Sequence, residues 1–328
     1  MPASRTGGAL VLLVVLGAAA APILAPHGTA DRFPDHLNAP PTRPHIIDRT
    51  GGVRAPFIYP WRLASRLDRR FEQDTTAPVR LRWFTGGRLV GSSDETSMPL
   101  LLLGSDRLGH DVFSRLLFGA RLSLALSIAA ALGSLLVGGL VGAISGYAGG
   151  STDDLLMKAT DLVMVLPTMY VALALRAVLP LVLEPATVFM FLAVIFAVIG
   201  APFVSRGVRG IVRTERRLEY AIAAVSLGAG HGRLLCRHLL PAARGFLAVQ
   251  ITMLVPAFIV AEATLSYVGL GFGDSATSWG TMLQEASNVG TFADFPWLLS
   301  PAAAIFLFVL GLNLLVQGKP DGLSKRIG

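Results

Sequence analysis

Long apolar stretches alternate with polar segments along the chain, and six of these stretches are long enough to form membrane helices. The hydrocarbon core of a bilayer is about 30 Å thick, and roughly 20 helical residues cross it. Helices are the expected form, because lipid offers no partner to backbone N–H and C=O groups and no alternating barrel pattern is present. The six expected spans are residues 9–25, 122–147, 160–179, 187–203, 246–268 and 298–317. The pattern therefore predicts an all-α integral membrane protein with about six transmembrane helices and a small extracytoplasmic subdomain after the first.

Composition supports a location in the bilayer and argues against several other classes of protein. The 328 residues are 53% hydrophobic and 15% charged, and the mean hydropathy is +0.61, more apolar than a soluble domain could cover with a polar surface. Cys236 is the single cysteine and no His-Glu-x-x-His pair occurs, so neither a disulfide framework nor a metal site is expected. The net charge is +7, but the basic residues lie between apolar spans and are not part of a soluble recognition module. No nucleic-acid partner is therefore expected.

The charges between the spans predict the orientation of the chain. Segment 204–245 contains eight arginines against two glutamates, so it should be cytoplasmic. Segment 269–296 contains acidic residues and no Lys or Arg, so it should lie outside. Segment 27–115 is also rich in arginine, but connections longer than about 60 residues escape the positive-inside bias, and we expect it outside as well. Both termini are then cytoplasmic in a multi-pass protein.

This topology predicts four regions along the chain. Residues 1–26 form an N-terminal transmembrane anchor, 27–115 an extracytoplasmic segment, 116–318 a transmembrane core with a cytoplasmic loop at 204–245, and 319–328 a cytoplasmic tail. The first region has a second interpretation, because Arg5, a short apolar core and the small residues at 17–21 also fit a cleaved signal peptide.

The most informative part of the cytoplasmic loop is segment 219–241. Its first half can form a helix whose small residues, including Ala221, would let another protein approach closely. Gly228 and Gly230 should end this helix, and Pro241 should not be accommodated inside a second one. The segment therefore predicts a compact helix-turn-helix on the cytoplasmic side.

At these positions the sequence resembles the binding-protein-dependent ABC importer permeases, and in particular their peptide-transporter branch. The matching residues are Glu219, Tyr220, Ala223, Ala224, Gly228, His238, Leu240 and Pro241. In that family this loop docks in a groove of the ATPase subunit, so the resemblance implies the same role here. Val225 stands where the family commonly has Arg and Ala242 where it commonly has Asn, which affects the detailed docking contacts.

The resemblance extends beyond the loop. Segments 103–115, 119–124, 261–271 and 278–283 are similar to dipeptide and oligopeptide permeases of the second type. The long segment before residue 103 and the ending at 313–321 depart from that branch, so another small solute, such as nickel or a modified peptide, stays open beside a di- or oligopeptide.

The resemblance also implies partners and a location in the bacterial inner membrane. The expected partners are two ABC ATPase subunits, a second homologous permease, an extracytoplasmic solute-binding protein and membrane lipid. ATP and Mg would be bound by the ATPases, with no cofactor in this chain. The chain's own Gly318-Lys319 pair lacks the earlier glycine of a phosphate-binding loop.

Several residues inside the spans are further candidates. Small residues recur every fourth position in the second span, which allows close helix packing within this subunit or against the partner permease. These are Ser134, Gly138, Gly142 and Gly146. Glu262 lies within the fifth span, where a charge must face protein or water, so it has either a structural partner or a place in the wall of the solute pathway. Pro167 and Pro256 would loosen their spans, and alternating access could use these kinks.

Two other functional classes fit the chain less well. An intramembrane enzyme needs a nucleophile with a base, or paired metal ligands, at bilayer depth. No expected span contains a histidine, and Glu262 and Asp161 are the clear carboxylates in the spans. A passive channel has no need of the coupling hairpin.

Overall fold

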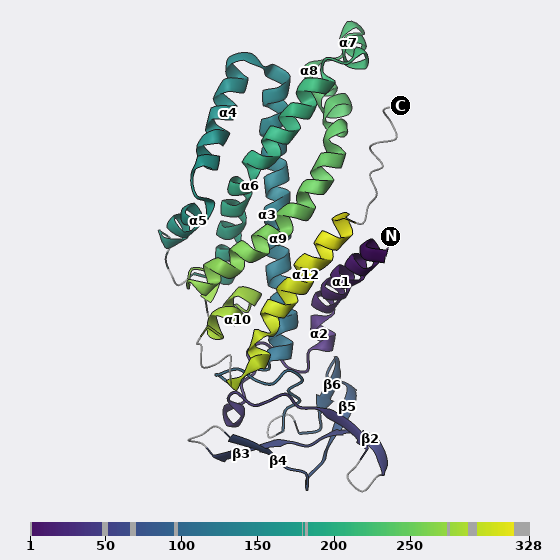
Figure 1. Cartoon of the computed structure of the whole chain (residues 1–328), viewed down its shortest axis with the longest axis vertical. Coiled ribbons are helices and arrows are strands. Elements are labelled where there is room, and N and C mark those ends of the chain that lie inside the picture. The colour runs from purple at the N-terminus through teal and green to yellow at the C-terminus, as the bar shows by residue number, and fades with distance from the viewer. Residues whose placement is uncertain are drawn as a thin grey trace. The chain divides into compact units, whose positions relative to one another are not determined.

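A computed structural model describes residues 2–47, 52–65, 70–94, 98–178, 180, 183–273, 276–287 and 294–317. The expected tail at 319–328 lies outside these residues. The chain forms two compact units, Met1–Ser123 together with Ser266–Gly328, and Leu124–Leu265. Most of the described residues are helical (Figure 1).

The first unit contains two apolar helices that pack along each other. The helices of this unit are α1 (Pro2–Ala19), α2 (Ala21–Leu24), η1 (Pro34–His36), α10 (Trp279–Glu285), η5 (Pro296–Leu299) and α12 (Ser300–Gln317), together with the beginning of α3. Figure 1 shows α1 and α12 side by side. Gly7 permits this approach, because a Cβ atom there would lie 2.6 Å from the carbonyl oxygen of Gly311. Such close backbone packing is typical of membrane helices.

The segment after α2 is built from strands. These are β1 (Pro44–Ile47), β2 (Val53–Ile58), β3 (Trp61–Ser65), β4 (Arg70–Gln73), β5 (Val79–Thr85) and β6 (Arg88–Ser92). They form a four-stranded sheet in the order β1-β2-β5-β6 and a two-stranded sheet of β3 and β4. Gly86 and Gly87, with φ of 62° and 78°, make the two-residue turn of the β5–β6 hairpin, which needs positive φ at both positions.

The strands correct the expectation of an all-α chain. Ile58, Leu81 and Leu100 form one small core under the sheet. The short alternation in β5, where Leu81 is buried between exposed Arg80 and Arg82, is the period-two pattern of a half-buried strand, and the prominence of the apolar spans obscured it.

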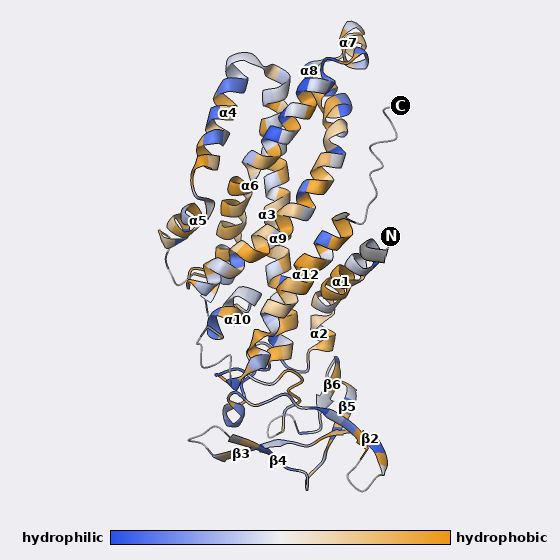
Figure 2. Ribbon diagram, viewed as in Figure 1, coloured by the Kyte–Doolittle hydropathy of each residue, from blue (hydrophilic) through white to orange (hydrophobic). Residues whose placement is uncertain are grey.

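The second unit is helical throughout its described part. Its elements are the remainder of α3 (Val112–Ala148), α4 (Gly150–Val165), α5 (Thr168–Ala177), α6 (Pro185–Glu215), α7 (Glu219–Ser226), α8 (His231–Leu234), the π turn η2 (Leu235–Leu239), the 3-10 turn η3 (Leu240–Ala243) and α9 (Arg244–Tyr267). The long helices α6 and α9 are predominantly apolar (Figure 2).

Four helical runs among the described residues are long and apolar enough to cross a membrane. They are Val112–Ala148, Pro185–Glu215, His231–Tyr267 and Pro296–Val316. The bent pair α4 and α5 makes a fifth if it is counted as one span, and Ser4–Ala19 is a shorter apolar helix. The chain is thus a mostly helical protein with four to five candidate spans, and the count of six stays a prediction.

The expected third span is not a single straight helix. The helix begins earlier, at Gly150, and ends at Val165, and the next helical segment turns by 88°. Leu166 is extended, with ψ of 133°, as is expected for a residue before proline. Pro167 therefore breaks this helix rather than only loosening it.

The helix that was expected to end before Pro241 continues through it. The run His231–Tyr267 is one helical run that contains a π turn followed by a 3-10 turn. The N–H of Leu240 bonds to the carbonyl of Leu235, and Pro241 sits at the start of η3. A proline lacks an N–H and clashes with the carbonyl four residues earlier, and the local change of hydrogen-bond spacing accommodates both effects. The expectation of a break at Pro241 was wrong for this reason.

The stripe of small residues on α3 lies against α6. A Cβ at Gly138 or Gly142 would overlap a carbonyl oxygen of α6, and one at Gly146 would lie 2.6 Å from the carbonyl oxygen of Arg209. The Oγ of Ser134 donates to the carbonyl of Ala197 at 3.1 Å. The two backbones therefore touch along the stripe inside the second unit.

Candidate coupling site

The segment between α6 and α9 forms a hairpin, which we define as residues 216–243. It begins with Arg216 and Arg217, continues through α7, turns at Gly228 and returns through α8, η2 and η3. Glu219 lies in the first turn of α7, where a carboxylate is favoured by the helix dipole. Basic residues at the end of α6 and in α8 colour this part of the chain blue in Figure 2.

The helix α7 presents large apolar side chains to the surroundings. Ile222, Val225 and Leu227 are exposed, Leu227 to 88%, and Tyr220 is exposed to 41%. Ala221 is buried and fixes α7 to the rest of the unit. A cluster of exposed apolar side chains on a short polar-flanked element is typical of a protein-binding surface.

The turn of the hairpin depends on the backbone of Gly228. Its φ is 85°, in the left-handed region that residues with a Cβ avoid. The N–H of Gly228 bonds to the carbonyl of Val225, and that of Ala229 to the carbonyl of Ala224. These two bonds form the Schellman motif, which closes a helix and sets the direction of the chain beyond it.

The two arms of the hairpin are joined near Tyr220. The Tyr220 hydroxyl donates to Glu215, the last residue of α6, at 2.6 Å. Burial, together with the hydrogen bond and charge of Glu215, raises the pKa of Tyr220 to about 12, so the hydroxyl stays a donor at neutral pH. The ring of His238 lies 6.4 Å from that of Tyr220, and buried Leu239 anchors the returning arm.

The residues of the family motif thus all lie in the hairpin, and they differ in how exposed they are. Ala223 and Gly228 are exposed, whereas Ala224, His238, Leu240 and Pro241 are partly buried. The exposed members are available to a partner, and the others hold the hairpin together.

A contact that sequence reasoning missed connects the hairpin to the end of α3. The hydroxyl of Tyr147 and Nδ1 of His231 share a hydrogen bond, and the Arg216 guanidinium donates to the Tyr147 carbonyl. The same guanidinium lies 5.2 Å from the centre of the Tyr147 ring, within cation–π distance. Both flanks of the hairpin therefore touch one tyrosine.

A second group of contacts in this unit lies at the corner between α3 and α4. Asp153 of α4 receives two hydrogen bonds of 2.5 Å from the guanidinium of Arg209 on α6, and the hydroxyl of Ser145 donates to the same carboxylate. Gly149 and Gly150, both at positive φ, make the sharp corner between α3 and α4. The ends of α3, α4 and α6 are thus tied together next to the hairpin.

The contact at Tyr147 gives a testable prediction. Tyr147→Phe removes the hydroxyl shared with His231 and leaves the ring in place, so the hairpin should be held less firmly against α3. One hydrogen bond contributes about 0.5–1.5 kcal/mol, and we expect amide hydrogen exchange in α7 and α8 to become about 2- to 10-fold faster. Tyr170→Phe, at a tyrosine that is 72% exposed, is the matched control. Equal exchange rates in the two variants would show that the Tyr147 hydroxyl does not hold the hairpin in place.

The remaining candidate residues lie away from the hairpin. Glu262 is fully buried in α9, about 30 Å along the helical run from Pro241. Its neighbour Ala261 lines an apolar cavity of about 190 Å³ together with Phe196 and Phe258, whose rings stack 5.4 Å apart.

Pro256 lies inside α9, and Pro167 lies between α4 and α5. The hairpin and these residues are thus separate sites. In the described part of the chain, no group of three His, Cys, Asp or Glu side chains is arranged to hold a metal ion.

Comparison with known proteins identifies relatives along most of the chain. The profile of a family described as binding-protein-dependent transport system inner membrane component matches residues 138–328. An oligopeptide transport system permease protein of Bacillus subtilis is 37% identical over 225 residues, covering 68% of this chain and 71% of that protein. A di/tripeptide transport system permease protein of Pseudomonas aeruginosa is 30% identical over 323 residues, covering 98% and 88%. A glutathione transport system permease protein of Pectobacterium atrosepticum is 34% identical and covers 69% and 72%. The region matched by the profile includes the whole hairpin.

Proposed function

This chain belongs to the family of binding-protein-dependent transport system inner membrane components, and we propose that it serves as the peptide-conducting permease of its importer, driven through the hairpin 216–243. Family membership confirms the resemblance found in the sequence: the chain is a permease subunit of a binding-protein-dependent ABC importer. Transport of peptides and the role of the hairpin are the parts that we propose.

The proposed role of the hairpin rests on one observation. Its exposed apolar surface is carried by a segment that is joined to the long helices α6 and α9. Leu227, Val225 and Ile222 face outward, which suits insertion into a groove of an ATPase subunit. The returning arm is continuous with α9, and the outgoing arm follows α6. Displacement of α7 by the ATPase would therefore rock both long helices and alternate the exposure of a central cavity.

The proposed topology has six spans with both termini in the cytoplasm. In this reading α1 is a retained span, and α4 with α5 is one broken span. The arginines at the end of α6 and in the hairpin then lie on the cytoplasmic side, as the positive-inside rule requires. The strand segment after α2 and the helix α10 lie outside, where an extracytoplasmic binding protein can deliver solute.

The proposed assembly follows the general organisation that the family name implies. Two ATPase subunits would bind ATP and Mg, a second related permease would complete the pathway, and a separate protein would bind the solute outside. This chain would hold no cofactor. Glu262 and the apolar cavity beside Ala261 are candidates for the wall of the pathway.

The proposed solute is a di- or oligopeptide. Two relatives are named as oligopeptide and di/tripeptide permeases, and the second of them is similar along 98% of this chain. A modified peptide is the second candidate, because another relative is named as a glutathione permease.

The native cysteine allows a direct test of the proposed orientation. Cys236 is the single cysteine and is exposed in the returning arm of the hairpin. A membrane-impermeant maleimide should label it in inverted vesicles and leave it unlabelled in intact spheroplasts. Arg82→Cys in a Cys236→Ser background should show the opposite pattern, because Arg82 is exposed on β5. Labelling of Cys236 from the outer side alone would end the proposal that the hairpin meets a cytoplasmic ATPase.

A further inference from the structure

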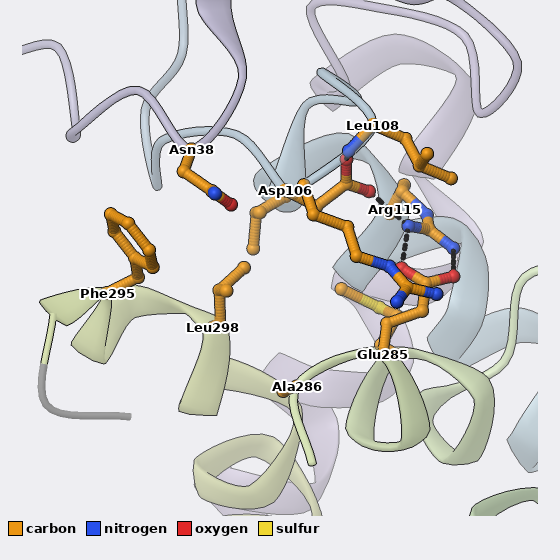
Figure 3. A pocket seen from close by; sticks show the side chains of 11 residues that line it. Asn38, Asp106, Leu108, Arg115, Glu285, Ala286, Phe295 and Leu298 are labelled. Atoms are coloured by element: carbon orange, nitrogen blue, oxygen red, sulfur yellow. Dashed lines mark hydrogen bonds and ion pairs between the residues drawn. The ribbon is translucent and has the colours of Figure 1, made fainter. Parts of the chain in front are cut away.

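A cavity of about 360 Å³ lies in the first unit, apart from the hairpin. It is bounded by the loop before α3, the first turns of α3, the end of α10 and η5 (Figure 3). Ligand sites in proteins usually measure about 300–1,000 Å³. The cavity is therefore at the small end of the range and suits an amino acid or the end of a short peptide.

The walls of the cavity are held in place by two tryptophans, of which Trp279 is buried and Trp297 partly buried. The indole N–H of Trp279 in α10 donates to the carbonyl of Leu116 at 3.1 Å, and its backbone N–H donates to the Ser123 hydroxyl at 3.1 Å. The indole N–H of Trp297 in η5 donates to the carbonyl of Ser105 at 3.0 Å. The cavity is thus preformed by long-range contacts within one unit.

Its two carboxylates are already engaged by the protein. Both oxygens of Glu285 accept from Arg115, at 2.5 and 2.7 Å. One oxygen of Asp106 accepts from the backbone N–H groups of Leu108 and His110, and the other meets the His110 ring and Arg115. Burial opposes ionisation of Asp106, but the hydrogen bonds from His110 and the charge of Arg115 outweigh it and lower its pKa. Because their oxygens already accept hydrogen bonds from the protein, these two carboxylates are not expected to be the main binding groups for a ligand.

Two buried polar atoms at the cavity have no partner among the described residues. They are Oδ1 of Asn38 and Nε of Arg115, on residues that are 3% and 6% exposed. Figure 3 shows the Asn38 side chain pointing into the cavity. A buried acceptor or donor without a partner is costly, so one atom awaits a donor and the other an acceptor. Arg107, exposed at the rim, adds a second guanidinium.

The rest of the lining is largely apolar and includes Phe295, Leu298 and Met282. The charges of the polar wall balance, since Asp106 and Glu285 offset Arg107 and Arg115. A zwitterion without net charge could therefore bind in the cavity without burying an unbalanced charge there. A simple anion would leave Oδ1 of Asn38 without a donor, and a simple cation would face the two guanidinium groups.

We propose that this cavity binds the carboxylate-bearing end of an amino acid or short peptide. The ligand carboxylate would accept from Arg107 and from Nε of Arg115, an N–H group of the ligand would donate to Oδ1 of Asn38, and its side chain would pack on Phe295 and Leu298. The inference rests on the proposed function in placing the cavity on the outer face, where solute arrives. The cavity would then be a reception site on the permease itself.

The test uses the assembled importer in lipid nanodiscs without its binding protein. Binding of leucine, leucyl-leucine and leucyl-leucinamide would be measured by saturation-transfer NMR and titration. We expect leucine, leucyl-leucine or both to bind, and the amide to bind at least about tenfold more weakly. Binding of leucine at the strength of the dipeptide identifies a free amino acid as the ligand, and binding of the dipeptide alone identifies a peptide end.

Variants at the rim separate this cavity from the transport pathway. Arg107→Gln, which removes a donor to the ligand carboxylate, and Asn38→Gly, which removes the acceptor of the ligand N–H group, should each weaken binding about tenfold or more, whereas Arg54→Gln, on the sheet, should leave it unchanged. Gly adopts the positive φ of 55° at position 38 without strain, and the melting temperature of each variant checks its folding. Unchanged binding in Arg107→Gln, equal binding of the amide, or no binding of any ligand would overturn the proposal.

A parallel measurement distinguishes the failure of this inference from failure of the proposed function. ATP turnover stimulated by solute and the binding protein would be followed in the wild-type complex. Normal turnover without binding at the cavity rejects the cavity alone, whereas the absence of peptide-stimulated turnover rejects the proposed function.

Discussion

Gly228→Asp is expected to abolish solute-stimulated ATP turnover while leaving membrane insertion of the permease intact. Position 228 directly follows the C-terminal end of α7, where the helix dipole disfavours a carboxylate, and it lies next to Leu227 in the exposed apolar surface. Asp tolerates the φ of 85° at this position better than most residues with a Cβ, and no neighbouring atom lies within 4 Å of a Cβ built there, so the effect comes from the new charge and not from a clash. A negative charge at the turn would oppose docking of the apolar surface in a groove of the ATPase. Turnover would be measured on the complete complex in nanodiscs.

The matched control is Gly232→Asp, four positions further along the same hairpin. Gly232 lies in α8 without a positive φ and also has open space around it. The new carboxylate would lie in the first turn of α8, where the helix dipole favours it. This variant should keep most of its turnover. Normal turnover in Gly228→Asp, or an equal loss in both variants, would argue against a specific role of the turn.

Gly142→Leu is expected to prevent stable folding of the helical core. A Cβ at this position would overlap the carbonyl oxygen of Ser205 and lie 3.0 Å from the backbone nitrogen of Arg209. Backbone atoms of a helix cannot yield as a flexible side chain can, so α3 and α6 would have to separate. Overpacking typically costs about 1–3 kcal/mol and occasionally more, and here it would also remove the close approach that lets membrane helices associate. We expect a large loss of monodisperse protein in mild detergent and a lower melting temperature.

Gly139→Leu provides the control for this prediction on the same helix. A Cβ at Gly139 meets nothing within 4 Å, and leucine has a higher helix propensity than glycine. This variant should fold as well as the wild type or slightly better. A stable, monodisperse Gly142→Leu protein would show that α3 does not depend on its contact with α6.

The features that follow from local pattern were accessible in the sequence. A bilayer requires long apolar helices. The runs that form α3, α6, α9 and α12 can each be recognised from their own apolar residues, without knowledge of the rest of the chain. The hairpin was also predicted, because Gly228 can adopt a conformation that other residues avoid and because the residues around it match a family motif. The family match confirmed which family the chain belongs to, and the role of the hairpin stays a prediction.

The boundaries of helices near proline were less accessible. Pro167 and Pro241 look alike as interruptions in an apolar pattern, but the chain turns by 88° beyond Val165 and continues as one helical run through Pro241. The difference lies in the hydrogen bonds that neighbouring residues make, such as the π-type bond from Leu240 to Leu235. These bonds depend on packing around each site and not on the proline itself.

The sequence alone thus determined that the chain lies in a membrane, which family it belongs to and which short segment is its hairpin, because each of these is encoded in residues close together along the chain. Tertiary structure alone decided that Tyr147 meets His231 and that Arg115 meets Glu285, contacts that join residues 84 and 170 positions apart. It also left Oδ1 of Asn38 facing a cavity. The physical reason is that a helix or turn follows from local backbone preferences, whereas the partner of a buried charge is chosen by how distant segments pack.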